Sequence, residues 1–313
     1  MVCGPAIYAP AVGTNRVLQY LHSNVPVCIS TAAAIPIPPS IKNNPIPSIV
    51  HPQQPVNGLN PEDVFYAVDD LGTQTGYGFI LYQQQPGLYP DCPVNMYFSL
   101  AGDPASRYLL FGALVARARI LQAANPQLRA RLYTSIAPDD AQMRDFYLHN
   151  GFDCDETDQV LQLAIPLGDG RIPMSCTVAA TPLHTWEEQN SLIYRLQTNE
   201  ISFVDLDYLN TLMRMPRFLA LGLYRNAILI GETIVAGQGP DCELVAIYME
   251  PGSRHQGMGR ALLHRTLAVM AAEGVTRVTT RIMSRSLPQS HLMADFGASV
   301  LGVNMLFPGI YLT

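Results

Sequence analysis

The feature that most constrains the fold is a partial match between two stretches 147 residues apart, in which an acidic residue opens both and a proline, a serine, an arginine and a glycine are in register. "DPASRYLLFGALVA" begins at Asp103, and "EPGSRHQGMGRALL" begins at Glu250. A second pair has the same spacing, with "VPVCISTAA" starting at Val25 and "IPMSCTVAA" at Ile172. Either match alone is weak, but two matches at one offset indicate two copies of one domain.

The length of the chain agrees with such a duplication. Its 313 residues suffice for about two domains of roughly 150 residues each. The turn-rich stretch "PLGDGRIP" at 166–173 is the expected linker. We therefore predict an N-terminal domain at residues 1–168 and a C-terminal domain at residues 169–313.

Composition excludes several classes of partner and location. The net charge of −6 leaves no basic footprint for nucleic acid or for an anionic membrane, and any partner steered by charge is a cation. No apolar run approaches the ~20 residues of a membrane span, and the N-terminal residues lack the pattern of a signal peptide. The six scattered cysteines indicate reduced thiols rather than disulfides or a metal site. We expect a cytoplasmic protein.

The second copy shows the patterns of alternating helices and strands. Thr185 and Glu188 form a capping box at the start of a helix over 184–197. Asp205 is the expected cap of the next helix, which Pro216 ends. Alternating or apolar runs predict several strands, and Gly274 suits the end of a helix that begins near 259. The pattern predicts an α/β (α+β) fold in which each copy is a mixed, mostly antiparallel sheet flanked by helices.

The first copy differs from the second in one segment. Residues 35–61 contain eight prolines, whereas the matching interval of the second copy contains only Pro182. A proline in a helix interior costs ~3 kcal/mol. We therefore expect an irregular or polyproline-like cover in place of the first copy's two helices.

The later copy of the repeated stretch places glycines where a strand gives way to a helix. Free N–H groups at a helix N-terminus favour an anion, and Gly257 and Gly259 allow a phosphate to approach the backbone closely. The loop lacks the terminal G-K-[S/T] of a Walker A motif, and Leu262 fills the third position of G-x-G-x-x-G. From the glycine spacing alone, an ordinary strand-to-helix turn remains an alternative.

The loop "RHQGMG" at 254–259 fits the signature [R/Q]-x-x-G-x-[G/A], and residues 172–313 resemble the GNAT superfamily of acyl-CoA-dependent N-acyltransferases. The resemblance implies two tandem GNAT-like domains, acetyl-CoA as cosubstrate and no metal. In that superfamily the loop amides hold the CoA pyrophosphate, and the end of the preceding strand pairs with the pantetheine. The cofactor-binding residues implied here are Ile247, Met249, Arg254, His255, Gln256, Gly257, Met258, Gly259 and Arg260.

One carboxylate stands where the superfamily's histone acetyltransferases carry their general base. Glu243 lies six residues before Met249 on the same expected strand, and a carboxylate can take the proton of the attacking amine. A solvated acid at the strand end is the alternative. The tyrosine that usually protonates the leaving thiolate is replaced by Met293, and a thioether cannot donate a proton.

The first copy is expected to be degenerate. At the offset of 147, Met96 stands opposite Glu243 and Leu110 opposite Gly257, although Tyr147 retains the superfamily's tyrosine position. We therefore predict that this copy neither binds acetyl-CoA nor turns over, and that it persists because it stabilises the second copy.

The predicted function is an acetyl-CoA-dependent N-acetyltransferase acting on a primary amine. The acceptor is a small-molecule or peptide amine; an amino acid, polyamine, aminoglycoside, peptide N-terminus and lysine side chain all stay open. A non-catalytic acyl-CoA-binding or sensor protein is one alternative, and a structural or interaction module is another. No nucleic acid or membrane partner is expected, and the chain could form a homodimer.

Overall fold

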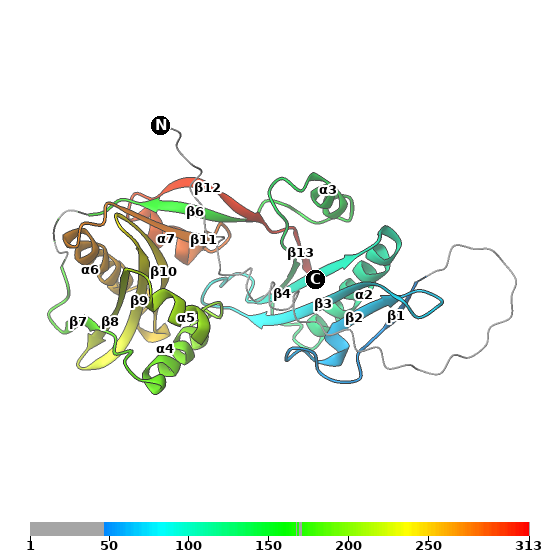
Figure 1. The fold of residues 1–313 in the computed structure, drawn as a ribbon, viewed down its shortest axis with the longest axis horizontal. Coiled ribbons are helices and arrows are strands. Elements are labelled where there is room, and N and C mark those ends of the chain that lie inside the picture. The colour runs from blue at the N-terminus through cyan, green and yellow to red at the C-terminus, as the bar shows by residue number, and fades with distance from the viewer. Residues whose placement is uncertain (1–46, 167, 169–170, 313) are drawn as a thin grey trace, which may run out of the picture.

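The computed structural model describes residues 47–166, 168 and 171–312. Within them the chain forms two lobes, each built on one β-sheet (Figure 1). The sequence match at Val25, the proline-rich residues 35–46 and part of the predicted linker lie outside the described residues.

The first lobe contains a six-stranded sheet in which only the β4–β5 pair is parallel. The strand order is β1 (Ser48–Val50), β2 (Val64–Val68), β3 (Gln74–Gln84), β4 (Val94–Gly102), β5 (Ala130–Tyr133) and β13 (Gly309–Leu312). Its helices are η1 (Pro61–Asp63), α2 (Pro104–Ala123) and α3 (Ala141–His149). The core lies between α2 and the sheet.

The second lobe contains a seven-stranded sheet in which only the β10–β11 pair is parallel. The strand order is β12 (Ser299–Leu306), β6 (Thr157–Leu163), β11 (Arg277–Met283), β10 (Asp241–Met249), β9 (Ile228–Gln238), β8 (Arg217–Arg225) and β7 (Cys176–Ala180). Helices α4 (Trp186–Thr198) and α5 (Leu206–Met213) pack on one face. Helices α6 (Met258–Ala272) and α7 (Leu287–Ala294) pack on the other, after the short η2 (Pro251–Ser253). The predicted fold class is confirmed.

Local sequence signals explain the limits of these helices. The Thr185 hydroxyl and the Glu188 carboxylate satisfy each other's backbone N–H groups at the start of α4, as the capping box predicts. The Asp205 carboxylate accepts from the Tyr208 N–H and so begins α5. Gly274 follows α6 with φ +87°, a conformation that favours glycine.

Residues 47–60 of the proline-rich segment contain no helix, and Pro61 begins η1. Between residues 47 and 60 the only regular structure is β1 and one isolated bridge between Val56 and Leu59. The expectation that prolines replace the two helices of the first copy stays a prediction, because residues 35–46 lie outside the described residues.

The two lobes exchange one strand each. β6 precedes the predicted linker, yet it lies inside the second sheet and pairs with both β11 and β12. β13, at the end of the chain, pairs with β5 in the first sheet. The division at residue 168 stays a prediction. β6 precedes this division in the sequence but lies in the second lobe, and β13 follows it but lies in the first lobe (Figure 1).

Buried charges accompany this exchange. Arg131 on β5 forms an ion pair with Glu156, and its other nitrogen donates to the Phe307 carbonyl at 2.8 Å. Arg285, which follows β11, lies 3.4 Å from the same carboxylate. One buried carboxylate thus joins groups from both lobes, where a low dielectric strengthens each interaction.

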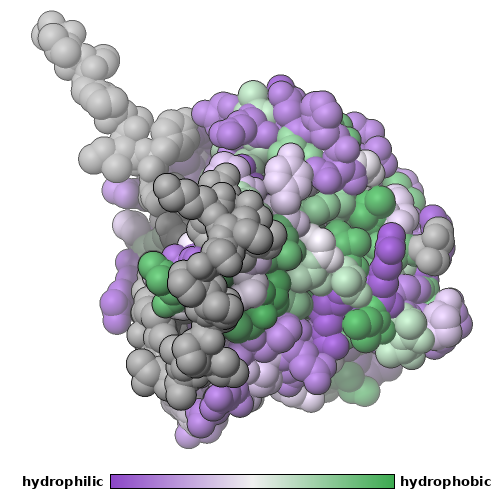
Figure 2. All heavy atoms as spheres, turned by 90° about the vertical axis from the view of Figure 1, so that its right-hand side faces the viewer, coloured by the Kyte–Doolittle hydropathy of each residue, from purple (hydrophilic) through white to green (hydrophobic). Residues whose placement is uncertain are grey.

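On the uncovered part of the first lobe's surface in Figure 2, apolar and polar residues are mixed. Exposed apolar side chains on this lobe include Leu71, Tyr108 and Ile120. Across the described residues, no helix has the length and apolar character needed to cross a membrane.

The position of β6 leads to a prediction about which fragments of the chain can fold. A fragment of residues 170–313 lacks β6, so β11 and β12 lose the strand between them and the buried Leu161 and Leu163 side chains. Each of these leucines stabilises the core by about 1.5–3 kcal/mol. We expect this fragment to aggregate or remain unfolded by circular dichroism. A control fragment of residues 153–313 retains β6 and should give more soluble, folded protein; equal folding of both would contradict the role of β6.

Candidate active site

The strands β10 and β11 are paired along only the first half of β10. Their parallel pairing runs from Asp241 to Leu244 and then ends, whereas β10 continues to pair with β9 as far as Met249. A bulge at Val245 shifts the register of β10 at this point. Residues 246–249 therefore present an unpaired backbone edge toward β11.

The bulge also determines which β10 side chains face which helices. Glu243 and Ala246 lie on the face covered by α4 and α5, as do their partners on β9. Ile247 lies on the opposite face and is half-buried against the cluster beneath α6. Met249 packs against Leu262 and Met258 at the start of α6. The strand end and the helix start thus form one packed unit.

The loop between β10 and α6 has an uncommon backbone. His255 and Gly257 adopt positive φ angles of +58° and +74°. Within the described structure, the backbone N–H groups of residues 255–260 have no hydrogen-bond acceptor, and no side chain caps α6. A Cβ at Gly257 would meet nothing within 4 Å. Six free donors beside open space at a helix N-terminus form a site suited to an anion.

Several predicted contact residues use their side chains within the protein. The Arg254 Nε donates to the Met249 carbonyl at 2.8 Å, and its Nη2 donates to Asn199 at 3.2 Å. Gln256 accepts from Arg225 at 2.8 Å. The structure therefore gives the Arg254 and Gln256 side chains a role in shaping the loop.

The remaining two residues of the predicted set lie at the helix start. A Cβ at Gly259 would lie 3.3 Å from the Met249 Cγ, so this glycine permits close packing of helix and strand. The exposed Arg260 side chain lies 4.0 Å from Asp295, and a surface pair of this kind contributes little to stability. Arg260 is thus available at the rim of the loop.

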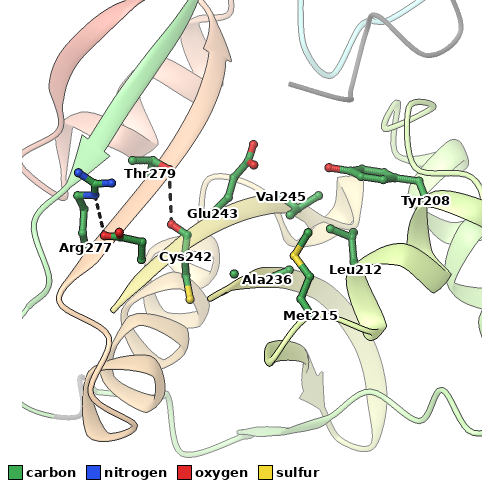
Figure 3. Close-up of a pocket in the computed structure, with 11 residues that line it drawn as sticks. Tyr208, Leu212, Met215, Ala236, Cys242, Glu243, Val245, Arg277 and Thr279 are labelled. Carbon is green, nitrogen blue, oxygen red and sulfur yellow. Dashed lines mark hydrogen bonds and ion pairs between the residues drawn. The ribbon is translucent and has the colours of Figure 1, made fainter. Parts of the chain in front are cut away.

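Glu243 lines a pocket of about 230 Å³ on the α5 side of the sheet. Tyr208, Leu212, Met215 and Val245 supply an apolar wall. Figure 3 shows the Glu243 carboxylate and the Tyr208 hydroxyl directed toward the same space. The pocket combines one carboxylate with apolar surface, which suits an amine attached to a hydrophobic group.

The exchanged strand β6 contributes to the surroundings of Glu243. The Arg281 Nε lies 3.3 Å from the Glu243 carboxylate, and the same guanidinium lies 3.9 Å from Asp158 on β6. Asn304 donates to Asp158 at 2.8 Å. Burial raises the pKa of Asp158, although Asn304 and Arg281 oppose the shift. Arg281 thus holds Glu243 in place and is itself anchored by a residue that precedes the predicted linker.

Sequence reasoning missed a buried polar network under the strand end. The fully buried Glu232 accepts from Arg195 Nε at 2.7 Å, Thr181 at 3.0 Å and the Tyr248 hydroxyl at 2.5 Å. Burial and the Glu232 carboxylate hold the pKa of Tyr248 far above its ordinary value. A glutamate within the apolar run of β9 was the available signal, because such a charge needs a partner. Tyr248 is therefore poorly suited to protonate a leaving thiolate.

The two positions that match the superfamily's tyrosine, Met293 in the second lobe and Tyr147 in the first, supply no proton donor to this pocket. Met293 is buried beneath α6. Tyr147 is buried in the core of the first lobe, in edge contact with Phe98, and burial raises its pKa. Tyr311 lies on β13 in the first sheet.

The first lobe lacks the loop for a reason other than the one predicted. α2 begins at Pro104, so the stretch that matches the loop is already helical, and Asp103 caps the Ser106 N–H at 2.8 Å. Leu110 is fully buried in the core. Early helix formation, and not the Leu110 side chain, therefore removes the free amides in this lobe.

Met96 and Glu243, which match in sequence position at the offset of 147, lie on non-equivalent faces of their sheets. β4 and β10 have matching bounds at the offset of 147. However, Met96 packs beneath α2, on the face equivalent to that of α6, whereas Glu243 lies on the opposite face. The strands therefore recur at this offset, but these two side chains do not lie on equivalent faces.

Solved structures similar to this chain are described as N-acetyltransferases. A GCN5-related N-acetyltransferase from Sphaerobacter thermophilus is 13% identical, with a TM-score of 0.45, and the match covers 82% of each chain. A tandem GNAT protein from the clavulanic acid biosynthesis pathway is 16% identical, with a TM-score of 0.42, over 79% of this chain and 82% of that one. A GCN5-related N-acetyltransferase from Anabaena variabilis is 10% identical, with a TM-score of 0.46, over 79% of this chain and 62% of that one.

The descriptions of these structures name the GNAT superfamily, whose signature the loop at 254–259 fits. With TM-scores of 0.42–0.46, however, the likenesses carry no argument about activity. No protein-family profile matches the chain, and no curated protein sequence matches it. Among the described residues, no group of three or more His, Cys, Asp or Glu side chains is placed to hold a metal.

The network at Glu232 makes a stability prediction. Glu232→Ala leaves the Arg195 guanidinium without its carboxylate partner, and breaking a buried pair in this way costs about 3–5 kcal/mol. Urea unfolding should show this loss. The control Glu273→Ala removes a half-exposed partner that lies 3.6 Å from Arg217, and it should cost less than about 1 kcal/mol. Equal costs for the two variants would show that the network contributes no more than a surface pair.

Proposed function

We propose that this chain is an acyl-CoA-dependent N-acyltransferase, with acetyl-CoA as donor, a primary amine as acceptor and one site in the second lobe. The observation that carries the proposal is the row of unpaired N–H groups at residues 255–260, beside open space at the N-terminus of α6. These donors match the oxygens of a pyrophosphate.

The donor fits the features next to this loop. The free edge of β10 at residues 246–249 offers backbone N–H and C=O groups to the amides of a pantetheine arm. Ile247 and Met249 lie beside that arm in this arrangement. Residues 254–260 surround the pyrophosphate, and the Gly257 backbone permits its close approach.

Glu243 acts as the general base. The acceptor must lose a proton to attack the thioester carbonyl carbon, and Glu243 takes that proton directly or through a water molecule. The new C–N bond forms, the C–S bond breaks, and CoA leaves as a thiolate. Because a thiol has a pKa near ~8.5, the thiolate is a tolerable leaving group, and water can protonate it.

The acceptor is a small-molecule or peptide amine that approaches from the α5 side. A pocket of about 230 Å³ limits the part of the acceptor that enters. Glu243 attracts the cationic form of the amine, and Leu212, Met215 and Val245 favour an apolar group next to it.

The loop can be tested with a single glycine. Gly257→Val places a β-branched side chain at a φ of +74° and in the space proposed for a phosphate. Strain of about 1–3 kcal/mol in the conformation that binds corresponds to roughly a 5- to 150-fold loss of affinity. Calorimetric titration with acetyl-CoA should show this loss. Gly252→Val is the control, because a Cβ there also meets nothing within 4 Å and the φ is not positive; equal affinities of the two variants would contradict the placement.

The base can be tested with an isosteric change. Glu243→Gln keeps the shape of the side chain and removes its ability to accept a proton, so kcat should fall about 10²- to 10⁴-fold, while acetyl-CoA affinity stays close to that of the wild type. Asp241→Asn is a control at the rim of the same pocket, where Asp241 forms an exposed pair with Arg277 at 2.8 Å. An unaltered kcat in Glu243→Gln would assign the base elsewhere.

A non-catalytic acyl-CoA-binding or sensor protein is the second candidate, favoured by the buried Met293 at the position of the usual tyrosine. Wild-type protein that binds acetyl-CoA but transfers no acetyl group to a broad panel of amines, followed by mass spectrometry, would establish this candidate instead.

A further inference from the structure

The connection between β3 and β4, residues 85–93, reaches from the first lobe to the second; we name it the bridging loop. It has nine residues, whereas the matching connection between β9 and β10 has two. Internal hydrogen bonds brace it, including Tyr89 N–H to Gln85 at 2.9 Å and Cys92 N–H to Tyr89 at 3.2 Å. Figure 1 shows the β3–β4 connection directed toward the second lobe.

One side of the bridging loop is attached to the end of β10. The N–H groups of Gly87 and Leu88 donate to the two carboxylate oxygens of Glu200, at 2.7 and 2.9 Å. Glu200 follows Asn199, whose side chain accepts from Arg254, and Arg254 in turn donates to the Met249 carbonyl. Hydrogen bonds on either side of the peptide bond between Asn199 and Glu200 therefore link the loop to the last residue of β10.

The other side of the bridging loop is attached to the end of β11. The Ser286 hydroxyl donates to the Leu88 carbonyl at 3.0 Å, and the Arg285 guanidinium lies 3.9 Å from the centre of the Tyr89 ring. Ser286 itself donates its N–H to Met283, the last residue of β11, at 2.8 Å. Tyr89 is almost fully buried in this contact.

β10 and β11 make no backbone pairs with each other beyond Leu244 and Thr280. Their separated ends are the two sides of the groove that receives the pantetheine in the proposed function. The bridging loop bonds to Glu200 on one side and to Ser286 on the other, and each of these residues is linked in turn to one of the two strand ends.

We infer that the bridging loop is a positioning element, supplied by the first lobe, that sets the width of the acyl-donor groove in the second lobe. The inference rests on the proposed function. Glu200 is its main attachment, because charge-assisted hydrogen bonds to a carboxylate are about twice as strong as neutral ones. The degenerate copy then contributes to donor binding without binding a donor itself.

The experiment compares two substitutions, each with a matched control. Glu200→Gln replaces one of the two acceptor oxygens with a donor that faces an N–H group. Glu187→Gln makes the same change at an exposed position in the first turn of α4. Gly87→Ala adds a methyl group that would overlap the Arg254 guanidinium and lie 2.9 Å from Glu200, whereas Gly112→Ala on α2 meets nothing within 4 Å.

Acetyl-CoA affinity is measured by calorimetry, with KM and kcat from initial rates. Losing one charge-assisted hydrogen bond corresponds to about a tenfold weaker Kd and a similarly raised KM for acetyl-CoA in Glu200→Gln and Gly87→Ala. The value of kcat at saturation should change little, and both controls should match the wild type. Thermal unfolding confirms that each variant is folded, and if one variant is unfolded the other decides.

The outcomes separate this inference from the proposed function. Wild-type protein without acetyl-CoA binding would overturn both. Wild-type binding together with unchanged or tighter binding in the folded variants would overturn the inference and leave the proposed function standing. A fall in kcat alone, with unchanged KM, would also contradict a positioning role in donor binding.

Discussion

The arrangement of the second lobe depends on where the parallel pairing of β10 and β11 stops. Four residues of β10 bond to β11, and the bulge at Val245 then turns the strand away. Because β9 still holds β10 as far as Met249, the separated end stays rigid while its other edge is free. The same end packs against the start of α6, so the open edge and the unpaired N–H groups of residues 255–260 are held side by side.

The two lobes are joined by the strands that they exchange. Each sheet contains a strand from the other side of the predicted linker, and Glu156 joins arginines from both lobes. The exchanged strand β6 also carries Asp158, which lies next to the Arg281 that contacts Glu243. The second sheet is therefore incomplete without a strand that precedes the predicted linker.

The sequence predicted local features well and long-range ones poorly. The capping box of Thr185, the Asp205 cap and the turn at Gly257 depend on residues close in the chain, and all three appear as expected. The strand exchange is invisible to such reasoning, because β6 carries an ordinary strand pattern and its partners lie more than a hundred residues away. The buried Glu232 could have been noticed as a charge inside an apolar strand, although its partners could not.

The internal repeat correctly indicated the order of the helices and strands, but not where α2 begins or which face of the sheet a side chain lies on. Elements recur in the expected sequence, and β4 and β10 have matching bounds. Helix α2, however, starts early and removes the loop, and Met96 and Glu243 face opposite sides of their sheets. Strand alternation makes a shift of one residue enough to move a side chain to the other face, and a single offset read from sequence cannot detect such a shift.

The central claim is that the second lobe alone presents a donor site, at the free edge of β10 and the loop that follows it. Hydrogen exchange followed by mass spectrometry, with and without saturating acetyl-CoA, tests this claim directly. We expect slower exchange at the backbone N–H groups of residues 246–260 and no change at residues 103–110 of the first lobe. Slower exchange at 103–110, or none at 246–260 when acetyl-CoA is bound, would contradict it.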